Sequence, residues 1–198
     1  MAATTGALFY RRSLAKKYLG TDDPAQVQTY LSDLPKFLET AKLIKEQSGG
    51  SCKIIASMGE LDQPFHYARK DPWVVNGNLV VDPAMIEYMK VAKLMNDEGY
   101  AMRFDQWSEG WFAGMNDALA DENGEAAQIF CYFLPTWGLH FVLKTNGIET
   151  GEDWGMVPGP MSYRWGGTWL GAWKDTPHKD EAKEFIRHLT TDDGFLEA

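Results

Sequence analysis

Apolar residues along this chain follow two different periods. Short apolar runs at residues 6–10, 52–57, 128–133 and 154–157 are typical of buried strands. Between these runs, apolar residues recur every three or four positions, a period that is typical of a helix with one buried face. Strands that alternate with helices predict a layered α/β domain in which helices flank a sheet.

Capping residues and prolines mark where the predicted helices begin. Ser32 and Ser108 stand where they would cap two helices, and Asp82 followed by Pro83 opens a third. Such side chains accept hydrogen bonds from the first free N–H groups of a helix, so they fix its start. The predicted helices are residues 11–19, 24–31, 33–47, 83–98, 109–116 and 179–189.

The middle of the chain contains a connection and a hairpin. Residues 58–73 predict a passage from a strand into a helix, and open α/β sheets usually place ligands beyond such strand ends. The pair Asn76–Gly77 is a turn signal, which predicts a small hairpin over residues 74–81.

Strand, loop and helix signals meet aromatic rings in the stretch at residues 154–189. Its glycines leave room for a ligand to approach the backbone closely. It begins with an apolar run at 154–157, which ends at Pro158-Gly159-Pro160. A loop with Tyr163, Arg164 and Trp165 follows, and then the pair Gly166–Gly167 and a second apolar run, predicted as a strand, at 168–173. A polar turn leads into a helix with Ala182, Phe185, Ile186 and Leu189 on one face.

This stretch resembles the extracytoplasmic sugar-binding proteins of ATP-binding-cassette importers, the family that includes maltose-binding protein. In that family, a strand ending in Pro-x-Pro precedes a glycine-led strand that crosses between two lobes. A polar turn then opens a helix similar to residues 181–194 here. The strand at residues 6–10, with the helix after it, is similar to another of the family's crossing strands.

The resemblance implies a type II periplasmic-binding-protein-like fold, in which a mixed sheet is flanked by helices in three layers. Residues 1–198 would form a single α/β lobe, the carboxy-terminal one, with crossing strands near residues 6–10 and 168–173. The helix at residues 179–190 normally packs on an amino-terminal lobe, so the expected fold is incomplete relative to the two-lobed family. An apolar helix face without its usual partner predicts self-association.

The resemblance also implies a function. We expect the solute-binding component of an importer, which binds a carbohydrate (an oligosaccharide), docks on a membrane permease, acts outside the cytoplasm and needs no cofactor. Two alternatives remain open. One is a carbohydrate-active enzyme with a pair of carboxylates, and the other is an α/β interaction module without a sugar site.

The charge of the chain excludes some partners. A net charge of −9 over 198 residues disfavours nucleic acid and anionic membrane, since both attract basic surfaces. No apolar run approaches the roughly 20 residues of a membrane helix, and residues 1–10 do not resemble a signal peptide. An exported family member would carry one, so we expect either a trimmed chain or an incomplete gene prediction. Cys52 and Cys131 lie in predicted strands, either as a disulfide or as two buried thiols.

A sugar site needs aromatic rings against the apolar C–H faces and polar groups around the hydroxyl rim. Trp137 follows the strand at residues 128–133, where the family carries a tryptophan that lines the site, although residues 134–136 depart from its Gly-Pro pattern. The glycine pair leaves room beside Trp165 and Trp169. The predicted ligand-binding residues are Trp137, Trp165, Trp169, Phe65, Gly167, Asp62, Gln63, Arg164 and Tyr10.

Signals for catalysis are weak. The sequence has no G-x-S-x-G nucleophile motif and no G-x-x-x-x-G-K-[ST] phosphate loop. Its four histidines lack metal spacing, and two separate cysteines do not make a zinc site. We therefore predict no catalytic residue and no metal site.

Overall fold

The computed structural model describes residues 4–120, 124–146, 153–167 and 169–191, which form two compact units. The main unit is Thr4–Trp165, the C-terminal unit runs from Gly166 onward, and each is described by itself. The strands are β1 (Gly6–Arg11), β2 (Cys52–Lys53), β3 (Val74–Val75), β4 (Asn78–Leu79), β5 (Gln128–Ile129), β6 (Cys131–Pro135) and β7 (Trp154–Val157). The helices are α1 (Arg12–Leu19), α2 (Pro24–Tyr30), α3 (Leu34–Gln47), α4 (Asp62–Ala68), α5 (Pro83–Asp97), α6 (Glu109–Ala113), α7 (Lys144–Asn146) and α8 (Lys179–Thr191), with a 3-10 helix η1 (Met58–Leu61) and a π-helix η2 (Leu139–Leu143).

The described strands of the main unit form a three-stranded sheet and two two-stranded sheets, with both parallel and antiparallel pairs. β1 lies between β6 and β7 and is antiparallel to both, whereas β2 pairs with β5 in parallel. The two groups of strands are joined, because the N–H of Arg11 donates to the carbonyl of Phe130 and the N–H of Cys131 donates to that of Ile54. The predicted mixed sheet is confirmed.

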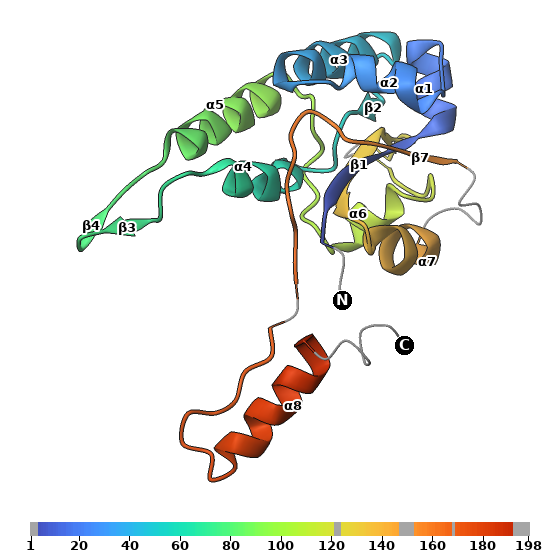
Figure 1. Ribbon diagram of the computed structural model, residues 1–198. Helices are drawn as coiled ribbons and strands as arrows, with labels where there is room; N and C mark the ends of the chain where they lie inside the picture. Colours follow the sequence, from blue (N-terminus) through green and yellow to red (C-terminus); the bar gives the residue numbers. More distant parts are fainter. Residues whose placement is uncertain (1–3, 121–123, 147–152, 168, 192–198) are drawn as a thin grey trace. The chain divides into compact units, whose positions relative to one another are not determined.

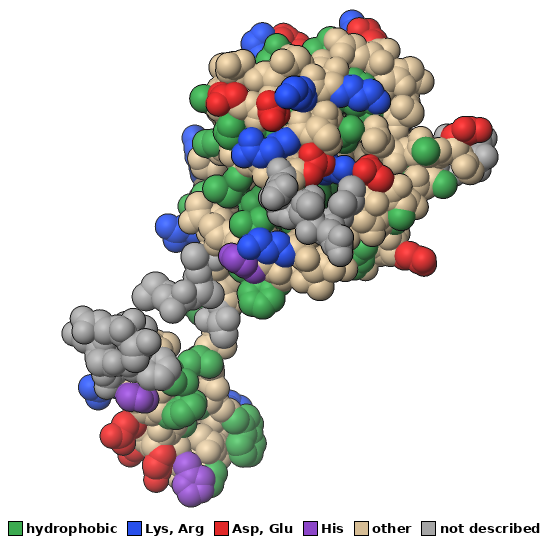
Figure 2. Space-filling model, turned by 90° about the vertical axis from the view of Figure 1, so that its right-hand side faces the viewer, with side chains coloured by type: hydrophobic (Ala, Val, Ile, Leu, Met, Phe, Trp, Pro, Cys, Tyr) green, Lys and Arg blue, Asp and Glu red, His purple; other side chains and the backbone are tan. Residues whose placement is uncertain are grey.

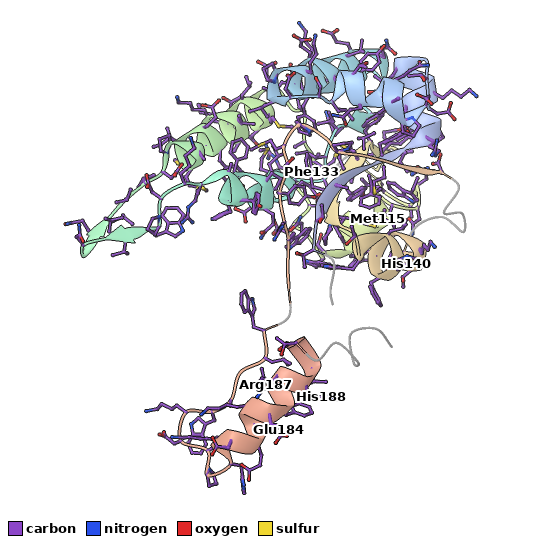
Figure 3. All side chains as sticks on the ribbon, viewed as in Figure 1. Met115, Phe133, His140, Glu184, Arg187 and His188 are labelled. Carbon is purple, nitrogen blue, oxygen red and sulfur yellow. The ribbon has the colours of Figure 1, made fainter. Side chains whose placement is uncertain are left out.

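Alternate residues of β1 and β6 face two separate cores. Figure 1 shows β1 and β7 with α1, α2 and α3 on one side and α6 and α7 on the other. Leu8, Tyr10 and Phe133 face a core built with α1, α3 and α5. Ala7 and Tyr132 face the other core, built with α6 and η2. Helices therefore cover both faces of the sheet, as the three-layer prediction requires. Phe133, labelled in Figure 3, is fully buried.

Most predicted helix starts agree with the structure, but one cap is wrong. Asp33, not Ser32, caps α3, because its carboxylate accepts the N–H of Lys36 at 2.9 Å. The Ser32 hydroxyl instead donates to that carboxylate at 2.9 Å. Asp82 and Ser108 cap α5 and α6 as predicted.

One other sequence prediction needs correction, and one open alternative is decided. Residues 169–173, predicted as part of a strand, have no regular structure, and Thr168 lies outside the described residues. A strand needs a pairing partner for its backbone, and Trp169 here is 95% exposed. The turns η2 and α7 were not predicted, because residues 139–146 lack a cap signal. Cys52 and Cys131 are buried free thiols rather than a disulfide.

A buried arginine joins three segments of the main unit. Arg11, at the end of β1, donates to the carboxylate of Asp117 at 2.9 Å and to that of Asp153. Asp153 also accepts the N–H of Ser13 at 2.7 Å, at the start of α1. The hydrogen bonds from Arg11 lower the pKa of Asp117. Arg11 therefore links the end of β1 to the segments that follow α6 and precede β7.

Replacing this arginine tests its contribution to stability. Arg11→Met should lower the free energy of unfolding in urea by about 2–3 kcal/mol. Breaking a fully buried ion pair usually costs more, but solvent screens the partly exposed Asp117. The contribution of Asp117 is present above its unfolded pKa of about 3.9 and is lost as pH falls through the lower folded value. The matched control Lys36→Met removes only an exposed pair with Glu39 and should cost less than about 1 kcal/mol. Equal losses in the two variants would contradict this role.

In the C-terminal unit, α8 has an exposed apolar face. Phe185 is 61% exposed, and Ala182, Ile186 and Leu189 are only partly covered. Figure 3 labels Glu184, Arg187 and His188 on the same helix. Self-association through this face stays a prediction.

Sedimentation at increasing concentration tests that prediction. We expect the wild-type chain to associate and Phe185→Lys to weaken the association, because the change places a charge on the apolar face. Glu184→Lys is the matched control, since it makes a charge change on an exposed position of the same helix. A wild-type chain that remains a monomer at high concentration would rule out self-association.

Candidate binding site

Five aromatic side chains of the main unit form one contiguous group, which we call the ring cluster. The rings of Trp107 and Trp137 are stacked, with centroids 6.4 Å apart and planes 14° apart. Trp165 lies 6.2 Å from Trp107 and 6.0 Å from Trp137. Trp111 and Phe112 lie 5.1 and 6.2 Å from Trp107. The cluster thus joins the start of α6, the end of β6 and the segment after β7.

The most exposed ring of the cluster stands on strained backbone. Trp107 is half exposed and has a φ of 71°, in the left-handed region that side chains rarely adopt. It is the third residue of a turn closed by the N–H of Ser108 and the carbonyl of Asp105, at 3.1 Å. That position often holds glycine. Strain of this kind costs about 1–3 kcal/mol and is concentrated at functional sites.

The other two outer rings are held by the strand ends. Trp137 follows β6 by two residues, and the N–H of Thr136 before it donates to the carbonyl of Thr5 at 3.0 Å. The N–H of Trp165 donates to the carbonyl of Thr4 at 2.9 Å. Both rings are partly buried, so each keeps some surface open to solvent. The chain just before β1 therefore positions both rings.

Beneath the outer rings lies a buried carboxylate. Trp111 is fully buried, and its indole N–H donates to Glu60 Oε1 at 2.5 Å. The backbone N–H of Phe133 donates to Glu60 Oε2 at 2.8 Å, and the side-chain amide of Gln106 donates to Oε1 at 3.4 Å. Glu60 is 1% exposed, and burial raises its pKa to about 7. The cluster therefore has an exposed outer side and a polar, buried anchor.

The structure brings together two of the predicted site residues, Trp137 and Trp165. Phe65 and Tyr10 lie in the core: Phe65 packs against Tyr88 on the inner face of α4, and the Tyr10 hydroxyl donates to the carbonyl of Asp22 at 2.8 Å. Neither has surface left for a ligand, so we leave both out of the site.

The remaining predicted residues stay predictions. Asp62 approaches the ring of His66 at 3.0 Å, Gln63 is partly buried, and Arg164 is exposed. Trp169 and Gly167 belong to the C-terminal unit.

Sequence reasoning missed Trp107, Trp111 and Glu60. A signal for Trp107 was present, because it stands directly before the capping Ser108, where a connection enters a helix. Nothing in the sequence marked its left-handed backbone. Glu60 lies in the stretch at residues 58–73, whose local structure the sequence left undecided.

The charged side chains of the described residues can be compared with what a metal ion or a nucleic acid would need. Among the described residues, no group of three His, Cys, Asp or Glu side chains could hold a metal ion. On the face drawn in Figure 2, basic and acidic side chains are interspersed. Within the described parts of the chain, no helix is long and apolar enough to cross a membrane.

The sequence matches the model of the bacterial extracellular solute-binding proteins over residues 1–198. The chain belongs to this family. The recognition made from residues 154–189 is thereby confirmed, and the description of the family is consistent with a place outside the cytoplasm. No curated protein matches the sequence significantly.

Solved structures with the same fold include sugar-binding proteins. An extracellular solute-binding protein of family 1 superposes with a TM-score of 0.73 at 17% identity, over 94% of this chain and 46% of that one. The binding protein from B. animalis subsp. lactis, in complex with β-1,6-galactobiose, gives 0.62 at 23% identity, over 98% and 47%. The galacto-N-biose/lacto-N-biose I-binding protein from Bifidobacterium longum gives 0.63 at 16%, over 96% and 46%. The type II lobe fold is confirmed, and the chain spans about half the length of these relatives.

Truncating single rings tests the layering of the cluster. Trp111→Ala should lower the free energy of unfolding by about 3–5 kcal/mol, the usual cost of emptying a buried aromatic position. Trp107→Ala should cost about 1 kcal/mol or less, because its ring is half exposed and alanine keeps the Cβ atom, so the backbone strain is the same with either side chain. Urea unfolding of both variants measures the two values. A larger loss for Trp107 than for Trp111 would contradict this order.

Proposed function

We propose that this chain carries half of a carbohydrate-binding site, and that the ring cluster is its binding surface. The observation that carries the proposal is Trp107, a large apolar ring kept half exposed on strained backbone beside Trp137 and Trp165. A protein gains little stability from such a ring, so a role in binding accounts for it better than a role in packing.

The chemistry of the cluster suits a sugar. Three outer tryptophans offer π-faces and edges to the polarised C–H groups of a pyranose ring. The stacked pair Trp107–Trp137 and the steeply inclined Trp165 present surfaces in more than one plane, which suits more than one sugar ring. Polar groups at the rim would bind hydroxyls, and the predicted partners Asp62, Gln63 and Arg164 are candidates for that role.

Relatives of the same fold support this ligand class. Two of them are described with bound β-1,6-galactobiose and lacto-N-biose, both disaccharides. In the whole protein, a second lobe would close over the cluster, and the closed form would dock on the permease of an importer. The whole protein would act outside the cytoplasm and would bind its ligand without breaking a bond, so no reducing ends should be released.

Quenching of tryptophan fluorescence tests the ring cluster. With increasing galactobiose or lacto-N-biose, the wild-type chain should become less quenchable by acrylamide, because the sugar covers Trp107. Trp107→Phe should remove most of this protection. The matched control is Trp73→Phe, which changes another partly exposed tryptophan, next to the β3–β4 hairpin. The guanidinium of Arg69 lies over the Trp73 ring, 4.3 Å from the ring centroid.

Two outcomes would contradict the proposed site. One is protection that survives in Trp107→Phe, and the other is protection that is lost in Trp73→Phe. Release of reducing ends during the titration would instead favour an enzyme.

A further inference from the structure

We propose that Glu60 is the positioning residue of the ring cluster, and that its protonation changes the geometry of the rings and, through it, the affinity for ligand. The inference rests on the proposed function for its ligand, but its first step concerns the rings alone. No direct contact between Glu60 and a ligand is needed.

Glu60 binds three segments at once, and each segment carries a ring. The indole N–H of Trp111 comes from α6, and the amide of Gln106 stands one residue before Trp107. The N–H of Phe133 belongs to β6, which ends two residues before Trp137. One carboxylate therefore sets the spacing between the start of α6 and the end of β6, which is the spacing of the stacked pair Trp107–Trp137.

The hydrogen bonds favour the charged form of Glu60. All three partners are N–H donors, and a carboxylate only accepts. After protonation, one oxygen carries a hydrogen and becomes a weaker acceptor, so the hydrogen bond from either Trp111 or Phe133 is weakened. Protonation should therefore loosen one of the segments that hold the rings.

Burial opposes that charged form. Desolvation raises the pKa of Glu60 to about 7, and the hydrogen bonds from Trp111, Phe133 and Gln106 act against this rise. No ion pair formed by the described residues includes Glu60. The pKa of Glu60 thus reflects two opposing effects: hydrogen bonds that favour the carboxylate, and burial that disfavours its charge.

The titratable groups that face Glu60 are neutral near pH 7. Cys131 and Tyr132 on β6, and Tyr163 after β7, interact electrostatically with the carboxylate. Burial raises the pKa of each of them. Glu60 is therefore the group in this set whose charge changes around neutrality.

The sign of the effect on stability follows from this pKa. An unfolded glutamate titrates near about 4.3, so folding takes up a proton between that pH and about 7. The free energy of unfolding should therefore fall as pH rises through this window. The rings should be held more rigidly at pH values above the window, where Glu60 is charged.

The test follows the indole N–H of Trp111 by NMR in the wild-type chain, without ligand. Its chemical shift should titrate with a midpoint near 7, and the near-ultraviolet circular dichroism of the rings should change with it. Glu60→Gln, which cannot ionise, should abolish both changes. Glu109→Gln, an exposed carboxylate on α6, is the matched control and should leave them intact. The wild-type titration decides the point even where Glu60→Gln folds poorly.

Absence of a Trp111 titration in wild type, or a titration that survives in Glu60→Gln, would overturn the inference. A second arm measures the affinity for galactobiose, which should fall at least about threefold from pH 8 to pH 6 in wild type as Glu60 takes up its proton. It should stay constant over this range in Glu60→Gln. An affinity that is independent of pH in wild type would overturn the link to ligand. Failure of every sugar to bind, with the Trp111 titration intact, would overturn the proposed function and leave the positioning role of Glu60 standing.

Discussion

Glu60 lies where the sheet, the turn before α6 and α6 itself meet. Its two oxygens accept N–H groups from Phe133, Gln106 and Trp111, and its burial makes each of these bonds costly to lose. The outer rings depend on this arrangement, because Trp107 rests on Trp111 and Trp137 extends from β6. A buried acid thereby fixes an exposed aromatic surface.

Arg11 makes a comparable connection at the other end of β1. Its guanidinium joins the segments after α6 and before β7, while the chain before β1 holds the backbone of Thr136 and Trp165. β1 therefore has a structural anchor at one end and the rings at the other. Since β1 is the central strand of its group, a disturbance at either end should reach the site.

The sequence predicted the layers well, whereas the predicted binding site stays a prediction. The alternation in β1 and β6, and the caps Asp82 and Ser108, depend on local patterns that a single sequence contains. Trp137 was predicted because it follows a strand, and Trp165 because it stands beside the pair Gly166–Gly167. The structure brings their rings together, and their role in binding stays a prediction. Trp107 was missed because its exposure depends on a left-handed backbone, and Glu60 because a buried carboxylate is defined by partners far away in sequence. Residues 169–173, predicted as part of a strand, have no regular structure, because apolar composition alone supplies no pairing partner.

We propose that the ring cluster is a binding surface, which would explain both the strain at Trp107 and the buried carboxylate of Glu60 beneath it. Isothermal titration calorimetry of this chain against a panel of mono- and oligosaccharides tests that account most directly. We expect heat of binding with short oligosaccharides, weaker with monosaccharides, since several rings cover more than one sugar unit. If the folded chain gave no heat of binding with any sugar of a broad panel, the proposed carbohydrate site would be contradicted, and only the assignment of the fold would stand.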